Sequence, residues 1–165
     1  MSRIRRTPAG DALSGLMLDF FRLNSLVLTA GDRLVAPLGL TSARWQILGA
    51  IVAAAHPEPV AWLARNLGAN RQNVQRIIND LHQEGLVVFD TNPHHRRAQL
   101  VVLTDKGRQA YDAAMRVQAP WINDLADGLP VKDIEIVQRV ITVLRRKLEG
   151  PDDAAMAGRG ASKRR

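Results

Sequence analysis

A run of polar side chains between residues 70 and 76 contains the residue types that recognise DNA bases. Asn and Gln amides can pair bidentately with adenine, and the Arg guanidinium can pair with guanine. A merely solvated helix face would more often carry Glu and Lys, yet no acid occurs here before Asp80. We therefore expect contacts to bases and phosphates from the side chains of Asn70, Arg71, Gln72, Asn73, Gln75 and Arg76.

A second basic group, Arg96 and Arg97, lies between two apolar runs at residues 86–90 and 99–103. The runs predict the two strands of a hairpin, with the arginines at its tip. An arginine at such a tip can enter a narrow minor groove, whose negative potential attracts it. The adjacent His94 and His95 have no carboxylate or cysteine at ligand spacing, so we expect no metal site.

The surrounding elements would position these two groups. Residues 60–67 predict a short helix, Gly68 a turn, and Asn70 the cap of a second helix that ends at Gly85. In that second helix the buried stripe would consist of Val74, Ile77, Ile78 and Leu81. Helix, turn, helix and hairpin in this order predict a mainly α fold with a small β-hairpin wing, a winged helix-turn-helix.

Long helices are expected on both sides of this segment. Residues 11–36 show apolar spacings of three and four, Thr41 is a candidate cap for the next helix, and Thr104 for a long helix in which Pro120 predicts a kink or local break. Leu18, Phe21 and Leu28 lie off the first apolar stripe, so the first helix should bury more than one face. A partner subunit is the natural explanation. The expected dimer interface consists of Leu13, Leu16, Phe20, Ile134, Val137, Ile141, Leu144 and Leu148.

The net charge of +7 is weak evidence for a DNA-binding surface, because much of it lies near the ends of the chain. Of the 23 basic residues, three fall in 1–9 and four in 151–165, where two of the 16 acidic residues also lie. Residues 10–150 retain 16 basic and 14 acidic residues, a net charge of +2. We expect residues 1–10 to be a flexible basic arm and 150–165 a disordered tail.

Several classes of protein are disfavoured by what the sequence lacks. It has no cysteine, and hence no disulfide or thiolate metal site. It shows no glycine-rich phosphate loop, nucleophile elbow or helical pair of metal-binding histidines, so we expect neither catalysis nor a cofactor. No long uncharged apolar run suits a membrane span and no secretory signal is visible, so we expect a cytoplasmic protein without a membrane partner.

Four segments together resemble the multiple antibiotic resistance regulator (MarR) family of bacterial transcription factors. They are LTSARWQIL at 40–48, VAWLARNLG at 60–68, NRQNVQRIINDLHQEGLV at 70–87 and RRAQLVVLTDKG at 96–107. Each is short, but their order between long terminal helices is specific, and the similarity covers residues 13–148.

The resemblance implies a homodimer that binds a pseudo-palindromic operator in double-stranded DNA, usually as a repressor. It implies one domain over 11–149, with a DNA-binding lobe at about 41–104 and interlocked dimerisation helices at about 11–36 and 104–149. Mapped onto this chain, the recognition helix spans 70–83 and the wing arginine is Arg97. The family wing usually has an aspartate two positions before that arginine; His95 occupies the place here, which weakens the expected orientation of Arg97.

In many such proteins a small, often aromatic ligand lowers operator affinity. Candidates to line its cleft are Arg44, Trp45, His56 and Trp121, with ordinary core and dimer packing as the competing interpretation. Two other functions stay open: a winged-helix protein-interaction module without operator binding, which should carry apolar anchors on the polar helix, and a ligand-modifying enzyme. The ligand, the operator and the choice between repression and activation are not encoded in any recognisable motif.

Overall fold

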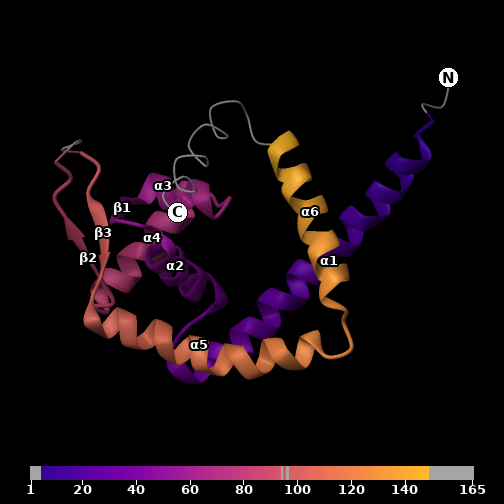
Figure 1. Ribbon diagram of the computed structural model, residues 1–165. Helices are drawn as coiled ribbons and strands as arrows, with labels where there is room; N and C mark the ends of the chain where they lie inside the picture. The colour runs from indigo at the N-terminus through magenta and orange to yellow at the C-terminus, as the bar shows by residue number, and fades with distance from the viewer. Residues whose placement is uncertain (1–4, 94, 96, 149–165) are drawn as a thin grey trace. The chain divides into compact units, whose positions relative to one another are not determined.

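The computed structural model describes residues 5–93, 95 and 97–148. The chain forms two compact units, residues 1–118 and 119–165, whose boundary falls inside one long helix. In chain order (Figure 1) the elements are α1 (Pro8–Val35), a short 3-10 helix (Ala36–Leu38), α2 (Ser42–Ala53), β1 (Glu58–Pro59), α3 (Val60–Asn66), α4 (Arg71–Gln83), β2 (Val87–Asp90), β3 (Leu100–Leu103), α5 (Asp105–Ala126) and α6 (Val131–Leu148).

Helix α1 begins earlier than the sequence analysis predicted. Thr7 caps it by accepting a hydrogen bond from the Gly10 amide at 3.1 Å, and Pro8 occupies the first turn, where its missing N–H costs nothing. The expected basic arm over 1–10 is therefore wrong for residues 8–10, which are helical. Residues 1–4 and the predicted tail at 150–165 lie outside the described residues.

By length and composition, the segment Pro8–Leu38 is apolar enough to cross a membrane. No such segment was expected from the sequence, because Asp19 and Arg22 interrupt the apolar run. None of the apolar window is buried within the chain. Helix α1 therefore exposes an apolar surface, which is unfavourable in water unless another apolar surface packs against it.

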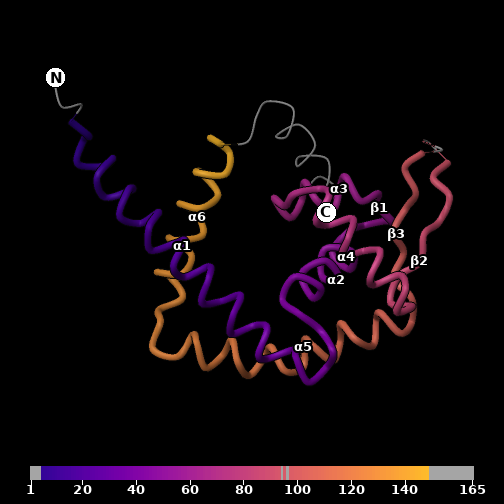
Figure 2. The backbone as a smooth tube through the Cα atoms, turned by 180° about the vertical axis from the view of Figure 1, so that it is seen from behind, coloured from indigo at the N-terminus to yellow at the C-terminus, as the bar shows by residue number. Residues whose placement is uncertain are grey.

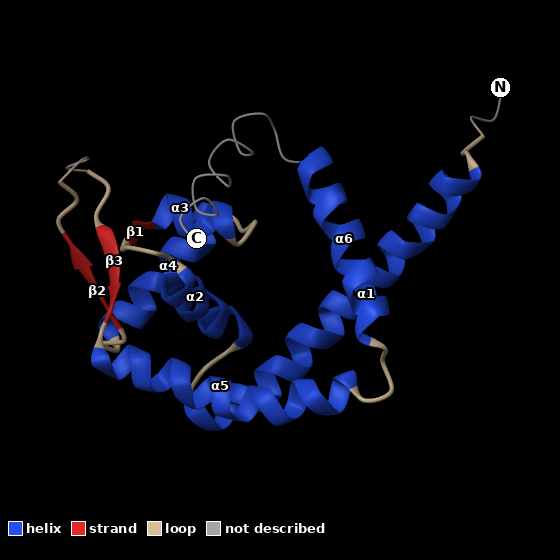
Figure 3. Ribbon diagram, viewed as in Figure 1, coloured by secondary structure: helices blue, strands red, loops and turns tan. Residues whose placement is uncertain are grey.

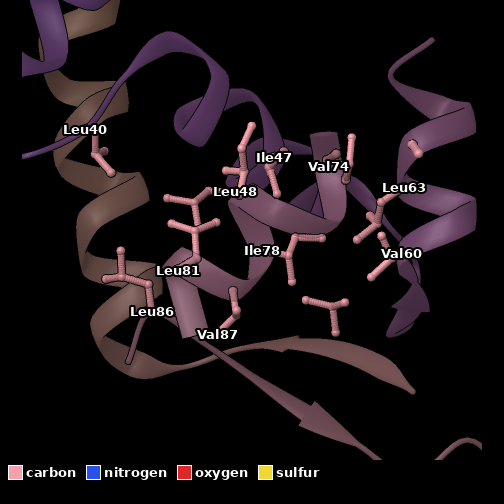
Figure 4. Packing of buried hydrophobic residues seen from close by; sticks show 14 of the residues in the cluster. Leu40, Ile47, Leu48, Val60, Leu63, Val74, Ile78, Leu81, Leu86 and Val87 are labelled. Atoms are coloured by element: carbon pink, nitrogen blue, oxygen red, sulfur yellow. The ribbon is translucent and has the colours of Figure 1, made fainter. Parts of the chain in front are cut away.

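The core of the first unit lies where α2, α3 and α4 pack on one another. Side chains from these three helices and β2 point into a common interior (Figure 4). Leu48 of α2 and Ile78 of α4 are fully buried, and Leu63 of α3 is nearly so. Burying side chains of this size contributes about 1.5–3 kcal/mol each, so this cluster fixes how α4 sits on its neighbours.

The wing is part of a three-stranded antiparallel sheet in the order β1–β3–β2 (Figure 3). Strands β2 and β3 form the predicted hairpin, with Val87 paired to Leu103 and Asp90 to Leu100. Strand β1 was not predicted; Glu58 and Pro59 pair with Val101 and Leu100. Two residues, one of them proline, are too few for any alternation to be visible in the sequence.

Helix α5 starts at the end of the wing and runs without interruption past Pro120 (Figure 2). Thr104 caps it as predicted, accepting from the Gly107 amide at 3.0 Å. The predicted local break at Pro120 is wrong, and a bend there stays a prediction. Pro120 cannot donate to the carbonyl of Arg116, and the boundary between the two units, after Gln118, lies beside it.

Candidate nucleic-acid interface

The start of α4 is set by the turn that precedes it. Gly68 has a φ of +61°, a backbone conformation that favours glycine, and it ends α3. Asn70 then caps α4: its Oδ1 accepts from the amides of Gln72 at 2.9 Å and Asn73 at 3.2 Å. The side-chain oxygen of Asn70, predicted to contact DNA, is thus used within the protein.

The buried stripe of α4 is the one that the periodicity predicted. Val74, Ile77, Ile78 and Leu81 are all buried, and Ile78 and Leu81 have no exposed surface. Because this stripe faces the core, the polar side chains of α4 must face away from it. We call these residues the recognition face: Arg71, Gln72, Asn73, Arg76 and Asn79, all exposed, and Gln75, half-buried.

The recognition face carries positive charge and internal hydrogen bonds. Arg71 and Arg76 are its charged members, and the first turn of α4 has no acid. Arg76 Nη2 donates to Asn73 Oδ1 at 3.1 Å, and Gln75 Nε2 donates to Asn79 Oδ1 at 2.9 Å. The face therefore combines positive potential with amide groups that can donate and accept.

The described part of the wing tip is held together around Asn92. Its Nδ2 donates to the Ala98 carbonyl at 2.9 Å, and its own carbonyl accepts from the His95 amide at 3.2 Å. The Ala98 amide donates to the His95 carbonyl at 3.0 Å. Arg97 is exposed between these residues. The other predicted wing arginine, Arg96, and His94 lie outside the described residues.

Tertiary contacts tie the end of α4 to β2, to α2 and to the start of α5, and none of them was predicted from the sequence. His82 bonds through Nδ1 to the Val87 carbonyl at 3.0 Å, and its ring lies 5.0 Å from the ring of Phe89 in β2. Arg44 of α2 forms an ion pair with Glu84, which follows α4. Lys106 Nζ donates to the Glu84 carbonyl at 2.7 Å. Arg44, His82, Glu84 and Lys106 are charged or polar residues of the kind found on any exposed helix. No local pattern in the sequence therefore singles them out.

The candidate ligand-cleft residues lie in different settings. Arg44 is mostly buried, pairs with Glu84 and donates to the Gly39 carbonyl at 3.0 Å. Trp45 packs against the core, and His56 is exposed and pairs with Glu58. Trp121 belongs to the second unit. The predicted absence of a metal site is not contradicted: within residues 5–93, 95 and 97–148, no group of three or more His, Asp or Glu could hold a metal ion.

Glu58 lies in β1 with a side chain only 14% exposed, and its Oε1 is 3.0 Å from His56 Nδ1. Burial raises the pKa of the Glu58 carboxyl, and the adjacent His56 partly offsets this by lowering that pKa. A carboxylate is therefore held at a cost in the strand that joins α3 to the wing sheet.

The predicted dimer residues are largely unburied within their own units. In α1, Leu16 and Phe20 are exposed and Leu13 is half-buried. The other exposed apolar residues of α1 include Leu18 and Phe21, which were expected to form a second apolar face, together with Leu23, Leu26 and Val27. In α6, Ile134, Val137 and Leu148 are exposed, whereas Ile141 and Leu144 are half-buried. Apolar stripes left open on two long helices are typical of protomers that pair.

Comparison with known proteins finds a family model and relatives that match this chain. Residues 38–98 match the model of the MarR family. An uncharacterized protein of Mycobacterium tuberculosis is 38% identical over 138 residues, covering 84% of this chain and 93% of that protein. The transcriptional activatory protein BadR of Rhodopseudomonas palustris is 29% identical over 143 residues, covering 82% of this chain and 81% of BadR.

Two solved structures share the fold. The transcriptional repressor CouR bound to a 23-mer DNA duplex superposes with a TM-score of 0.69 at 24% identity, covering 86% of this chain and 99% of that one. CouR from Rhodococcus jostii RHA1 bound to p-coumaroyl-CoA gives a TM-score of 0.69 at 22% identity, covering 79% and 90%.

Proposed function

The chain belongs to the MarR family of DNA-binding transcriptional regulators, and we propose on that premise that it is a homodimeric repressor released from its operator by a small aromatic ligand. Members of this family are regulators rather than enzymes. The observation that carries the proposal is the recognition face of α4, which is exposed, polar, positively charged and free of acids in its first turn. Such a regulator works in the cytoplasm, where bacterial DNA lies.

We propose that α4 enters the major groove and that the wing enters an adjacent minor groove. Base contacts come from the recognition face, and Arg71 and Arg96 add contacts to phosphates. Arg97, exposed at the wing tip, contacts the minor groove. Because the phosphate contacts release counterions, operator affinity should fall steeply as salt rises.

The dimer supplies the second half of the operator contact. We propose that a second copy covers the exposed apolar stripes of α1 and α6, because long apolar stripes exposed to water are unfavourable. The same cover explains an apolar α1 without invoking a membrane. Under this proposal residues 41–104 are the DNA-binding lobe, and 11–36 and 104–149 supply the dimerisation helices.

Ligand release is proposed by analogy with CouR, which has been solved with p-coumaroyl-CoA. The candidate cleft residue Trp45 offers aromatic surface, while Arg44 and His56 of the same unit offer polar groups. Arg44 pairs with Glu84 directly after α4. An anionic ligand that drew Arg44 away would therefore loosen the tie between α2 and the end of the recognition helix.

A second candidate function is transcriptional activation, favoured by the similarity to BadR. The two functions use the same DNA-binding geometry and differ in where the operator lies relative to the promoter. A protein-interaction module is disfavoured because, among the residues that the structure describes, the exposed large apolar side chains include none from α4.

Selection of bound fragments from the source genome tests the proposal. We expect a few pseudo-palindromic sites to be enriched, with affinity that falls as salt rises and with release by particular aromatic compounds. Deleting the gene should raise transcription from the adjacent promoter for a repressor and lower it for an activator. Selection that enriches no sequence contradicts operator binding.

A further inference from the structure

The side chains of the recognition face are not equivalent, because two pairs of them are already bonded to one another. The Asn73–Arg76 pair spans three residues of α4, and the Gln75–Asn79 pair spans four. Both spacings place side chains next to each other on a helix surface. The side chain of Gln72 is exposed, and among the described residues it forms no such bond with a neighbour.

The bond to Asn73 fixes Arg76 without exhausting it. An Arg guanidinium has five N–H donors in a planar fork, and Asn73 Oδ1 accepts from only one of its terminal nitrogens. Donors remain for the O6 and N7 acceptors of a guanine. Asn73 Oδ1 accepts from Arg76 with one of its two lone pairs, so the Asn73 amide is turned toward the arginine. Pairing with adenine needs both the oxygen and the nitrogen of an amide turned toward the base.

Gln72 has the opposite property. Its amide oxygen and nitrogen are both available, which is the combination that pairs with the N6 and N7 groups of adenine. Gln75 is half-buried and its nitrogen is directed to Asn79. Gln72 and Arg76 are four residues apart, about 6 Å along the helix axis, which exceeds the spacing of about 3.4 Å between successive base pairs and leaves room for the two side chains to reach different base pairs.

We propose that Gln72 and Arg76 are the base-recognising residues of α4, for adenine and guanine respectively, and that Asn73 is a positioning residue that orients Arg76. This division of roles rests on the proposed operator binding. It predicts an adenine and a guanine at separate fixed positions of each half-site. It also predicts that Asn73 affects the guanine position without contacting a base.

The test is a selection of randomised double-stranded DNA with the full-length protein and its variants, scored as base preference at each half-site position. Arg76→Ala should lower the preference for guanine at one position by about 5- to 150-fold, and Gln72→Ala should do the same for adenine at another. Asn73→Ala should lower the guanine preference by about 1.5- to 2-fold, at the same position as Arg76→Ala. In the double variant the two effects should not add, because both act through Arg76.

Asn73→Asp separates positioning from base contact. Aspartate keeps an acceptor for Arg76 and suits the first turn of a helix, so guanine preference should be retained even if overall affinity changes. Gln109→Ala, on the exposed surface of α5, is the control and should leave every position unchanged.

Three outcomes would overturn the inference. The first is that Asn73→Ala relaxes a position different from that of Arg76→Ala, which would show that Asn73 contacts a base itself. The second is that Asn73→Asp loses the guanine preference as Asn73→Ala does. The third is that the wild-type protein enriches an operator whose base preferences none of the variants alters. If wild-type protein enriches no sequence at all, the proposed operator binding fails first, and this inference falls with it.

Discussion

Replacing Gly107 with alanine should destabilise the protein although it places a better helix former inside a helix. Gly107 lies in the first turn of α5 and is buried against the segment that leads into the wing. A Cβ at this position would lie 2.9 Å from Leu103 Cδ1 and 3.0 Å from the carbonyl carbon of Leu86, and closer still to the Leu86 oxygen. A flexible side chain could move aside, but the main obstacle is backbone.

That backbone is held firmly. The Leu86 amide donates to the Leu81 carbonyl at 2.8 Å, and the Leu86 carbonyl accepts from the Thr104 amide and hydroxyl, each at 3.1 Å. Overpacking of this kind costs about 1–3 kcal/mol. Loss of one of the bonds to Thr104 adds about 0.5–1.5 kcal/mol. The helix preference for alanine returns about 0.5–1 kcal/mol. The net expectation is a destabilisation of about 2 kcal/mol.

Urea denaturation followed by circular dichroism measures this change, at one fixed protein concentration because the proposed dimer couples stability to concentration. Gly15→Ala is the matched control. Gly15 is helical and has no atom within 4 Å of an added Cβ. The control should gain about 0.5–1 kcal/mol. If Gly107→Ala gained stability as well, the close approach to Leu86 would not constrain the fold.

Three further perturbations test other parts of the molecule. Arg97→Ala should weaken operator binding by about 1–3 kcal/mol without changing the urea midpoint, and unchanged affinity in a gel-shift titration would remove Arg97 from the mechanism. Val137→Glu should yield a monomer with weakened DNA binding, because it places a charge on the apolar stripe of α6. Light scattering reports the mass, and Arg139→Glu, on the opposite side of α6, is the control. A fully active monomer would refute the dimer requirement. Glu58→Gln should gain stability relative to the wild type as the pH rises above the ordinary carboxyl pKa of 4.5, because the raised pKa of Glu58 lets the folded state hold a proton that the unfolded state has released. The contribution of Glu58 to stability is lost as the pH rises through its raised pKa, and a pH-independent difference in urea midpoint between the two proteins would contradict this.

Much of the DNA-binding segment could be predicted because its determinants are local. The stripe of Val74, Ile77, Ile78 and Leu81 follows from helical periodicity, and the structure buries all four. The caps at Asn70 and Thr104 and the turn at Gly68 follow from preferences of single residue types. The early start of α1 is equally local, since Thr7 and Pro8 are a typical cap and first turn, although the apolar stripe itself begins only at Leu13.

The remainder depends on residues that are distant in the chain. Strand β1 exists because Glu58 and Pro59 meet the edge of β3, more than forty positions later. Arg44 finds Glu84, 40 positions later, only after the helices have packed. His82 lies only a few residues from Val87 and Phe89, but it meets them only once β2 packs against the end of α4. The wing is a further example. The sequence pointed to His95 as the residue that affects the orientation of Arg97, whereas in the structure the described tip is held by the bond from Asn92 to Ala98.

The sequence by itself therefore determined the order of elements, the buried side of α4 and the chemical character of the face opposite it, because periodicity, caps and side-chain type act over a few residues. Only the folded structure decided which members of that face bond to one another. The bond from Arg76 to Asn73, and the absence among the described residues of such a bond at the Gln72 side chain, depend on side-chain orientation, which spacing along one helix allows but does not fix. It also decided that Gly107 must be glycine, because the obstacle is the backbone of Leu86, brought against α5 by the packing of the wing.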